Sequence, residues 1–563
     1  MIVMDCETWP VHAGLRAPRL VCVTTSTDGI LHRDGGARSF FEEALAREGE
    51  VFVGHNIAYD WGVICSEWPD LLPAVFRAYA EDRVLDTMIR AQLHAIRRGI
   101  FKKERYSLEA LAINLCNIPP FKSPWRLRYC ELDNVPLGDW PEEARQYCLN
   151  DVDATSRVFE ALGPITAEPL HTRAAWALHL ASCWGMRTDP EAVADLEDSL
   201  ESKLGGLNEK LKKVGILREN GVKDTKFLKR LCTEAGSKAT TDNGGVCTDK
   251  YVIGSIDAEW ARAYSKREEL NTLYSTFLPV VRRGVDFPIN CDFPAMVESG
   301  RTASKNPNLQ NLPRGGGVRE CFIPRPGKVF ISADYSSNEL RSLAQVQLDW
   351  FGRSTLGDVL NAKKDPYLVM GAEILGTSYE DVYSRRQSPE IKRLRRIAKV
   401  IVLGLPGGLS KPSTVRNYAR GYGVDIPESD VPALKKKWER AYPEMKAYHK
   451  RIKVQGSTAF VERAQFVRAG LSFTQHCNTH FQTLSAVGGK AALFEVSRRC
   501  YTVPDSSLYG SRIVVWVHDE IILETGNPDS GAELCQVMRE QMDLFTPDVP
   551  SEVEPRVLTR WEK

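Results

Sequence analysis

The segment RIVVWVHDEIILE (residues 512–524) decides how the C-terminal part of the chain folds, because it sets three ionisable residues between two apolar runs. The apolar runs predict two buried strands joined by a tight turn at His518, Asp519 and Glu520. An unpaired buried carboxylate costs several kcal/mol. We therefore expect the acidic side chains of this turn to be exposed, paired or bound to a metal ion.

A second apolar run, FISADYSSNELR (residues 330–341), predicts a strand that ends near another carboxylate, Asp334. If the hairpin lies beside this strand, its tip presents Asp519 and Glu520 next to Asp334. Divalent ions such as Mg²⁺ prefer carboxylate oxygens, so the two aspartates can share a pair of ions. Compensation of these charges by metal is the explanation that we favour.

The segment between these strands, RLRRIAKVIVLGLPGGLS (residues 393–410), predicts a basic helix. Arg395 and Lys399 are four residues apart and share one helix face. Two cations in this register suit a triphosphate, because arginine offers a planar fork of donors and lysine a point charge. Taken alone, such a helix is more often a solvated surface. Pro406, among glycines, predicts a break or kink at the helix end.

The N-terminal region holds a second set of acidic residues, in the short motifs MDCE, GHNIAYD and YCLND. Asp5 and Glu7 are two residues apart on a predicted strand, so both side chains leave the same face. Asp60 lies in a helix-like segment after a strand, and Asp151 comes four residues after Tyr147. An acidic pair at this spacing is common by chance. The three motifs in this order, however, resemble the tyrosine-containing subclass of the DEDD-type 3′→5′ exonucleases.

Phosphodiester hydrolysis explains these residue types. Charge must be neutralised on the non-bridging oxygens, a water activated and the leaving oxygen stabilised, and two divalent ions about 3.5–4 Å apart do all three. The resemblance implies that two Mg²⁺ ions, with Mn²⁺ as a substitute, are held by carboxylates and that Tyr147 orients the attacking water. The implied metal ligands are Asp5, Glu7, Asp60 and Asp151.

Further motifs occur in the order DYSSNELR, RRIAKVIVLG and VHDE, and GRTASKNPNLQNLP precedes them. This order resembles motifs A, B and C of the family A DNA polymerases, the DNA polymerase I family. The resemblance covers essentially the whole chain. It implies an α/β and α+β multidomain fold, with an N-terminal RNase H-like exonuclease domain followed by a right-hand polymerase domain of palm, fingers and thumb.

The resemblance also implies domain boundaries. The exonuclease domain is expected at 1–165 and the polymerase domain at 166–563. The subdomains are expected at about 180–290 for the thumb, about 351–469 for the fingers, and about 291–350 and 470–563 for the palm. A polar, glycine-bearing insert at 236–250 is expected to form a mobile tip among long helices.

Individual residues of the polymerase half acquire roles through the same resemblance. Asp334 and Asp519 are implied as catalytic metal ligands for two Mg²⁺ ions, with Glu520 beside them. Glu339 corresponds to the family glutamate that obstructs a ribose 2′-hydroxyl, so deoxynucleotides should be preferred. The residues implied at the incoming triphosphate are Arg395, Lys399 and Leu403.

Four residues match family positions at the primer–template DNA, namely Arg301, Asn478, Gln482 and His518. All base pairs present acceptors at purine N3 and pyrimidine O2 in the minor groove. Donor side chains there sense pairing geometry without reading the sequence. Without the surrounding motifs, the same residues would be interpreted as a surface arginine, two helix-face amides and a structural histidine.

The basic helix departs from the family pattern. Arg395, Lys399, Leu403 and Gly407 fall at steps of four and are expected to share one slowly drifting face. The family has aromatic rings at the positions of Leu403 and Gly407, and both are absent here. We hypothesise that the template slot is roomier or more mobile than usual, which would relax nucleotide selection or admit a modified base.

Composition limits the class of protein. The 563 residues are too many for one core, the net charge is +1, and the 14 cysteines show no metal-ligand spacing. No apolar run reaches the roughly eighteen residues of a membrane span, and no secretion signal precedes the first motif. We therefore expect a cytoplasmic monomer that acts on primer–template DNA and dNTPs without a membrane, and no particular replisome partner is predicted. No 5′-nuclease domain precedes the exonuclease motifs in this sequence, and in this respect the chain resembles compact phage-type enzymes.

Four functions compete as interpretations of these motifs. The main prediction is a template-directed DNA polymerase with a proofreading exonuclease and two-metal-ion chemistry at both sites. An exonuclease with a weakened polymerase half or relaxed nucleotide selection draws on the altered basic helix. A DNA-binding accessory without catalysis conflicts with the two carboxylate sets, and a single-subunit RNA polymerase conflicts with Glu339 and the exonuclease motifs.

Overall fold

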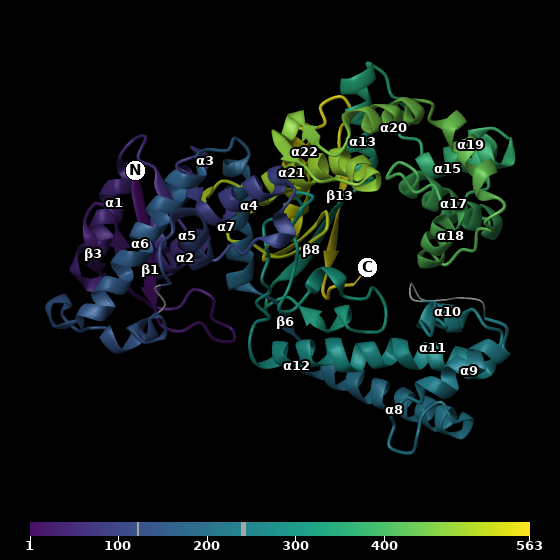
Figure 1. Cartoon of the computed structure of the whole chain (residues 1–563), viewed down its shortest axis with the longest axis horizontal. Coiled ribbons are helices and arrows are strands. Elements are labelled where there is room, and N and C mark those ends of the chain that lie inside the picture. The colour runs from purple at the N-terminus through teal and green to yellow at the C-terminus, as the bar shows by residue number, and fades with distance from the viewer. Residues whose placement is uncertain (121–122, 238–243, 563) are drawn as a thin grey trace. The chain divides into compact units, whose positions relative to one another are not determined.

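Two compact units make up the computed structural model, which describes residues 1–120, 123–237 and 244–562 (Figure 1). The larger unit consists of Met1–Trp184, Asn290–Asn306 and Ile331–Val557. The smaller unit consists of Gly185–Ile289, Pro307–Phe330 and Leu558–Lys563. Each unit is therefore assembled from segments that are far apart in the sequence.

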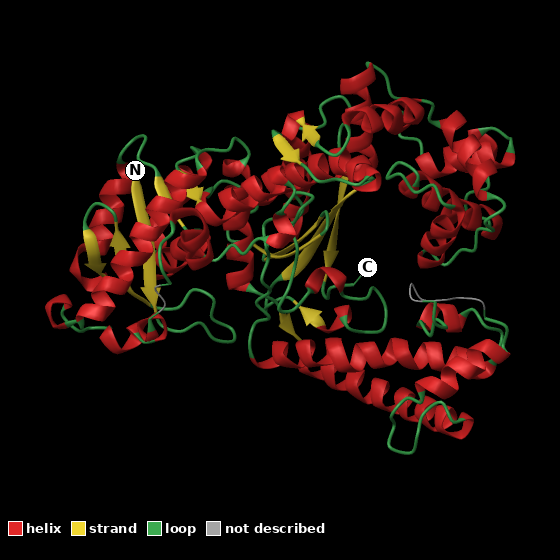
Figure 2. Cartoon of the chain, viewed as in Figure 1, coloured by secondary structure: helices red, strands yellow, loops and turns green. Residues whose placement is uncertain are grey.

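The N-terminal part of the larger unit is built on a five-stranded sheet. Its strands are β1 (Ile2–Thr8), β2 (Leu20–Thr25), β3 (Gly29–His32), β4 (Phe52–Gly54) and β5 (Val84–Asp86), in the spatial order β3-β2-β1-β4-β5. β1 pairs antiparallel with β2 and parallel with β4. The surrounding helices, red in Figure 2, are α1 (Arg38–Ala46), α2 (Ala58–Glu67), α3 (Leu72–Ala80), α4 (Thr87–Arg98), α5 (Leu108–Cys116) and α6 (Glu142–Leu162). This is the α/β arrangement that the alternation of strands and helices predicts.

The C-terminal part of the larger unit is built on a four-stranded sheet. Its strands are β8 (Val329–Tyr335), β11 (Arg512–Val517), β12 (Glu520–Thr525) and β13 (Val553–Leu558), in the order β11-β12-β8-β13. β11 and β12 form the predicted antiparallel hairpin. The helices that pack around this sheet include α7 (Glu168–Trp184), α21 (Phe473–Thr502) and α22 (Gly531–Asp543).

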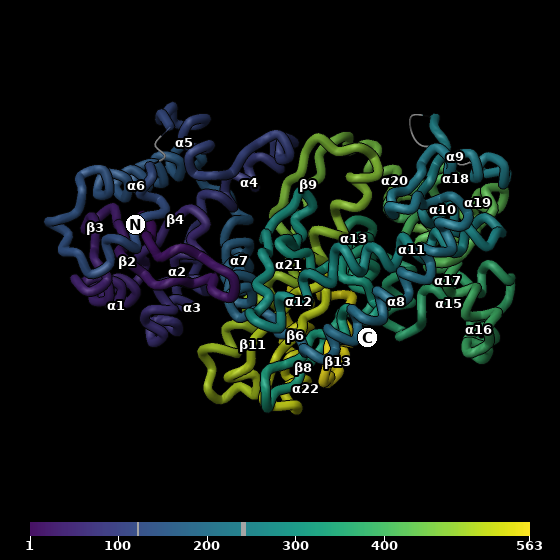
Figure 3. The backbone as a smooth tube through the Cα atoms, turned by 90° about the horizontal axis from the view of Figure 1, so that it is seen from below, coloured from purple at the N-terminus to yellow at the C-terminus, as the bar shows by residue number. Residues whose placement is uncertain are grey.

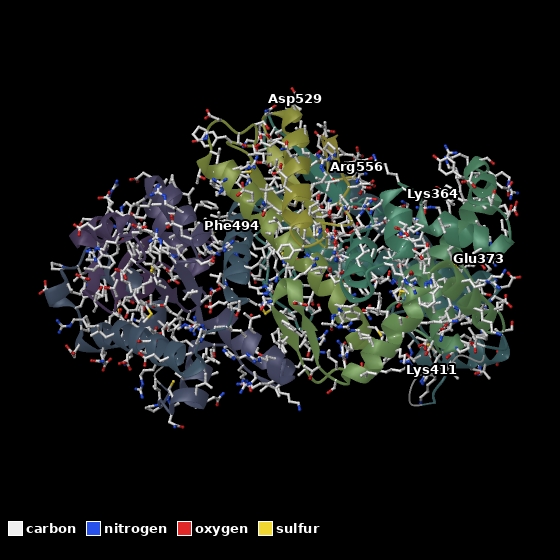
Figure 4. The ribbon with its side chains drawn as sticks, turned by 90° about the horizontal axis from the view of Figure 1, so that it is seen from above. Lys364, Glu373, Lys411, Phe494, Asp529 and Arg556 are labelled. Carbon is white, nitrogen blue, oxygen red and sulfur yellow. The ribbon has the colours of Figure 1, made fainter. Side chains whose placement is uncertain are left out.

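Helix α21 connects the two parts of the larger unit. The ring of Phe494 on α21 (Figure 4) lies 5.8 Å from that of Phe76 on α3, measured between centroids. Phe76 in turn lies 5.8 Å from Trp176 on α7. The N-terminal and C-terminal sheets therefore share a buried aromatic cluster, and the boundary at residue 165 stays a prediction.

Residues 350–470 are helical except for a short hairpin near the end of this range. Its helices, with the one that leads into them, are α13 (Asn338–Phe351), α14 (Thr355–Asn361), α15 (Pro366–Leu375), α16 (Tyr379–Ser384), α17 (Pro389–Gly404), α18 (Pro412–Gly421), α19 (Val431–Ala441) and α20 (Glu444–Gln455). The hairpin, β9 (Ala459–Val461) with β10 (Phe466–Arg468), was not predicted, because each strand has only three residues.

The smaller unit is mainly helical. Its elements are α8 (Pro190–Val214), α9 (Thr225–Glu234), α10 (Lys250–Gly254), α11 (Glu259–Thr272), α12 (Leu278–Asp286) and the antiparallel pair β6 (Arg187–Thr188) and β7 (Phe322–Ile323). Helices α8 and α11 lie side by side (Figure 3). Trp561 is buried, with its ring 5.4 Å from that of Phe322 and 4.7 Å from the guanidinium carbon of Arg319. Residues 238–243 of the predicted tip lie outside the described residues.

Across the described parts of the chain, we find no helix with the length and apolar character needed to cross a membrane.

The close approach of α21 to α22 gives a first prediction. A Cβ atom on Gly488 would lie 2.9 Å from Cε and 3.2 Å from Cα of Met542, so Gly488→Ala should lower the free energy of unfolding by about 1–3 kcal/mol. Gly206, exposed in α8, has no atom within 4 Å of such a Cβ, and Gly206→Ala should raise it by up to about 1 kcal/mol. Urea unfolding followed by circular dichroism measures both. An unchanged midpoint for Gly488→Ala would show that α22 does not approach so closely.

Candidate active sites

Strand β1 and helix α6 bring the N-terminal acidic residues together. Asp5 and Glu7 lie two residues apart on β1, where Asp5 pairs with Thr24 and Glu7 with Cys22 of β2. Asp151 approaches them from α6. The ligand oxygens of Asp5, Glu7 and Asp151 all lie within 4.8 Å of one another, and no other group of three acidic, histidine or cysteine side chains in the described residues is as close.

Asp60 is tied to the same strand. It lies buried in the first turn of α2, and its Oδ1 accepts a hydrogen bond from the backbone N–H of Cys6 over 3.0 Å. Cys6 stands between Asp5 and Glu7, so this bond anchors α2 at the centre of the acidic cluster. The four predicted carboxylates are therefore neighbours, although their roles stay predictions.

Burial raises the pKa of every carboxyl group in this cluster. The charges of Asp60 and Asp151 raise the pKa of Asp5 further. Burial raises the pKa of Asp60 to about 8 and that of Asp151 to about 6. Oε1 of Glu7 is buried and accepts no hydrogen bond within the part of the chain that the structure describes. A divalent cation would relieve this repulsion and satisfy that oxygen, so the donor set fits such an ion.

Two neighbours of Asp151 favour the charged form of its carboxyl group. Tyr147, one turn earlier on α6, forms a side-chain hydrogen bond to Asp151, which lowers the carboxyl pKa against the effect of burial. Arg126, in the 3₁₀ turn Pro124–Leu127, lowers it as well. No motif pointed to Arg126, because it lies in an irregular segment without a periodic pattern.

The pairing of β8 with the hairpin brings Asp334 and Asp519 together. The N–H of Tyr335, next to Asp334, donates to the carbonyl oxygen of Asp519 over 3.4 Å. Burial, and after it the charge of Asp334, raises the pKa of Asp519 to about 7, while Arg301 offsets part of this rise. Two carboxylates that repel each other in a half-buried position again form a donor set that suits divalent cations.

The hairpin turn itself is strained. Val517 pairs with Glu520, so His518 and Asp519 form a two-residue turn, and His518 has a φ of 60°. A non-glycine residue in this left-handed region costs about 1–3 kcal/mol. Glu520 is buried and accepts a hydrogen bond from the Ser332 hydroxyl, two residues before Asp334 on β8.

Arg301 links two of the predicted site residues. Its guanidinium forms an ion pair with Glu339 in the first turn of α13. The same cation lowers the pKa of Asp519, so it lies close to that carboxyl group as well. Asp334, Asp519, Arg301 and Glu339 thus make up one site.

The two predicted triphosphate-binding cations lie on one side of α17. Nε of Arg395 donates to Oδ2 of Asp365 over 2.6 Å. The Arg395 guanidinium carbon lies 5.0 Å from the centre of the Tyr367 ring, and Nζ of Lys399 lies 5.8 Å from the same centre. Leu403, further along α17, is partly buried against the helical core.

Helix α17 ends at Gly404, before Pro406, as the proline predicts. The expectation that Gly407 continues the face of Arg395 and Lys399 is wrong, because the backbone leaves the helix three residues earlier. The space beside Gly407 is also occupied, since a Cβ atom there would lie 2.6 Å from Oδ1 of Asn478.

Asn478, whose contact with DNA stays a prediction, contacts the loop after α17 in this structure. Its Nδ2 donates to the carbonyl oxygen of Gly407 over 3.3 Å and to that of Thr474 over 2.9 Å. Gln482 lies one turn further along α21 and is partly buried. Sequence patterns could not reveal the contact with Gly407, because it joins residues that are far apart in the chain.

Comparisons with known proteins agree with this architecture. A family model described as DNA polymerase family A matches residues 190–563. The chain is 23% identical over 555 residues to DNA polymerase I of Aquifex aeolicus, covering 91% of this chain and 88% of that protein. It is 29% identical over 286 residues to DNA polymerase I of Pseudomonas aeruginosa, covering 48% of this chain and 29% of that protein.

A solved structure has a similar fold over the full length. The POL domain of Pol1 from M. smegmatis, in complex with DNA primer-template and dNTP, superposes with a TM-score of 0.72 at 18% identity, covering 100% of this chain and 95% of that one. The matches to six further curated relatives span 27–31% of their lengths.

Repulsion in the N-terminal cluster gives a second prediction. In EDTA at pH 8, Glu7→Gln should raise the free energy of unfolding by about 1–3 kcal/mol, because it removes one of several buried like charges. Added Mg²⁺ should then stabilise the wild type more than the variant. Denaturant unfolding with and without Mg²⁺ measures both effects.

The matched control is Glu143→Gln, exposed on α6, which should change stability by less than about 0.5 kcal/mol. A Glu7→Gln variant that is less stable than the wild type in EDTA would contradict the repulsion.

Proposed function

Since the chain belongs to the family A DNA polymerases, we propose that it is a template-directed DNA polymerase that carries a 3′→5′ proofreading exonuclease. The observation that carries the polymerase activity is the proximity of Asp334 and Asp519 where β8 pairs with the hairpin. The observation that supports the exonuclease is the second carboxylate cluster on β1, α2 and α6.

The residues around Asp334 and Asp519, called the first site below, have different roles in synthesis. Asp334 and Asp519 hold the metal ions, and Arg395 and Lys399 bind the triphosphate as a fork and a point charge. The contact with Asp365 fixes the direction of the Arg395 guanidinium. At both sites, bound Mg²⁺, or Mn²⁺ in its place, supplies charge neutralisation at the phosphate oxygens and lowers the pKa of the attacking hydroxyl or water.

Glu339 selects the sugar of the incoming nucleotide. Its side chain obstructs a 2′-hydroxyl, and the ion pair with Arg301 restricts the positions that its carboxylate can take. Deoxynucleoside triphosphates are therefore the substrates, and primer–template DNA is the partner. Arg301 also lies near the primer end, because it is close to Asp519.

Residues of the second site support hydrolysis. Asp5, Glu7, Asp60 and Asp151 hold the ions there. The Tyr147 hydroxyl, held next to Asp151, orients the attacking water. The two activities use different residues on different sheets, so they can be removed separately.

A second candidate function is a nuclease whose polymerase half synthesises weakly or with relaxed base selection. The observation that favours it lies in the loop after α17. A glycine, Gly407, stands there in place of the family's aromatic residue, and its carbonyl oxygen accepts a hydrogen bond from the Asn478 amide. The main proposal remains stronger, because the carboxylates and the cations of the first site are all present.

A primer-extension assay with dNTPs and Mg²⁺ tests the two activities. Asp519→Ala should lower extension by roughly a thousandfold or more, because a metal ligand acts in the chemical step, and should leave primer shortening intact. Asp529→Ala, exposed on the surface (Figure 4), is the matched control and should extend like the wild type.

The reciprocal variant in that assay is Asp5→Ala with Glu7→Ala, which should abolish primer shortening and spare extension. Loss of both activities in either variant would contradict two separate sites. Equal extension from dNTPs and NTPs would contradict the role of Glu339.

Substitution of Gly407 tests the altered loop. Gly407→Tyr should change the kcat/KM for correct insertion, or its ratio to that for incorrect insertion, by at least roughly tenfold, because the new Cβ displaces the Asn478 amide. Steady-state insertion opposite each template base measures this. Gly421→Ala at the end of α18, with no atom within 4 Å of the new Cβ, should change neither value. If Gly407→Tyr also changed neither, the loop would have no part in base selection.

A further inference from the structure

We propose that Lys490 is a positioning residue for DNA synthesis: its buried amine holds the tight turn that directs Arg301 toward Glu339 and Asp519. This inference rests on the proposed function, because Arg301 acts at the primer end only in a polymerase.

A closed turn precedes Arg301. The N–H of Gly300 donates to the carbonyl oxygen of Val297 over 2.8 Å, and the N–H of Val297 donates to that of Arg301 over 2.8 Å. Gly300 has a φ of 77°, which glycine adopts without strain. The turn therefore determines the position of the Arg301 backbone, provided that the turn itself is held in place.

Helix α21 holds this turn through two side chains. Nζ of Lys490 donates to the carbonyl oxygen of Gly300 over 2.6 Å. The Thr483 hydroxyl donates to the carbonyl oxygen of Ser299 over 3.0 Å. Lys490 and Thr483 are two helical turns apart and lie on one face of α21. Two successive carbonyl groups of the turn are therefore bonded to one rigid element.

The segment is also held just after Arg301. The indole N–H of Trp516 on β11 donates to the Thr302 hydroxyl over 3.0 Å. With Gly300 and Thr302 both bonded, the backbone of Arg301 has little freedom. Its side chain can then meet Glu339 and Asp519 without first ordering the segment that carries it.

Packing alone does not require a lysine at position 490. The side chain is 1% exposed, and burial lowers the pKa of its amine to about 7. Its second partner is Nδ1 of His171 on α7, at 2.8 Å, and no carboxylate among the described residues forms an ion pair with it. Methionine would fill the same space without this desolvation cost. What the amine supplies in addition is the hydrogen bond to Gly300.

The test is Lys490→Met in the full-length protein. The kcat/KM for primer extension should fall roughly 10- to 100-fold, as expected when a contacting group is misplaced by about 1 Å. Shortening of a single-stranded primer should stay at the wild-type rate, since that site lies on other elements. Arg301→Ala and the double variant Arg301→Ala with Lys490→Met complete a mutant cycle.

A positioning role and a merely structural role give different results in this cycle. If Lys490 acts through Arg301, Lys490→Met causes no further loss in the Arg301→Ala background. If it only stabilises the fold, the two losses multiply, and the inference is overturned. Thr483→Val, which removes the other bond to the turn, should lower extension by a smaller factor that also disappears in the Arg301→Ala background.

Two further outcomes keep the test decisive. If Lys490→Met loses primer shortening as well, the cycle is repeated with Lys490→Gln, which stays polar but cannot reach Gly300. If the wild type extends primers and Lys490→Met extends them at the same rate, this inference alone is overturned. If the wild type does not extend primers at all, the proposed function is overturned.

Discussion

Hydrogen bonding between β8 and the β11–β12 hairpin keeps Asp334 and Asp519 close together although their charges repel each other. Strands β8, β11 and β12 are largely buried and adjacent in one sheet, so the two carboxylates cannot separate without breaking strand pairs. Arg301 offsets part of the repulsion, and the remainder is a local destabilisation that the surrounding core must outweigh. The other contacts of this site, from the Arg301–Glu339 ion pair to the turn before Arg301, surround this pair of carboxylates.

The N-terminal cluster follows the same construction with different elements. There a strand supplies two carboxylates, and helices α2 and α6 supply one each. The bond from Cys6 to Asp60 plays the part that strand pairing plays at the other site, because it prevents the acidic side chains from moving apart. Two unrelated sheets therefore share one arrangement, in which carboxylates of like charge are held close together and either a proton or a divalent cation relieves their repulsion.

Local patterns predicted most of the frame of both sites. Period-two geometry places Asp5 and Glu7 on one face, and the apolar runs around His518 predict the hairpin. Contacts between distant segments could not be predicted in this way. Lysine is almost never fully buried, so no sequence pattern predicted the buried position of Lys490. The contact of Asn478 with Gly407 depends on where α17 ends, which the steps of four residues did not reveal.

Trp561 has a consequence for how the smaller unit is made. Its ring covers Phe322 and Arg319, yet a ribosome adds it long after helices α8 to α12 have been synthesised. The nascent unit therefore carries an uncovered aromatic face while the whole of the intervening chain is translated. The step that covers this face therefore comes late in folding, because it joins Trp561 to a strand that is synthesised much earlier.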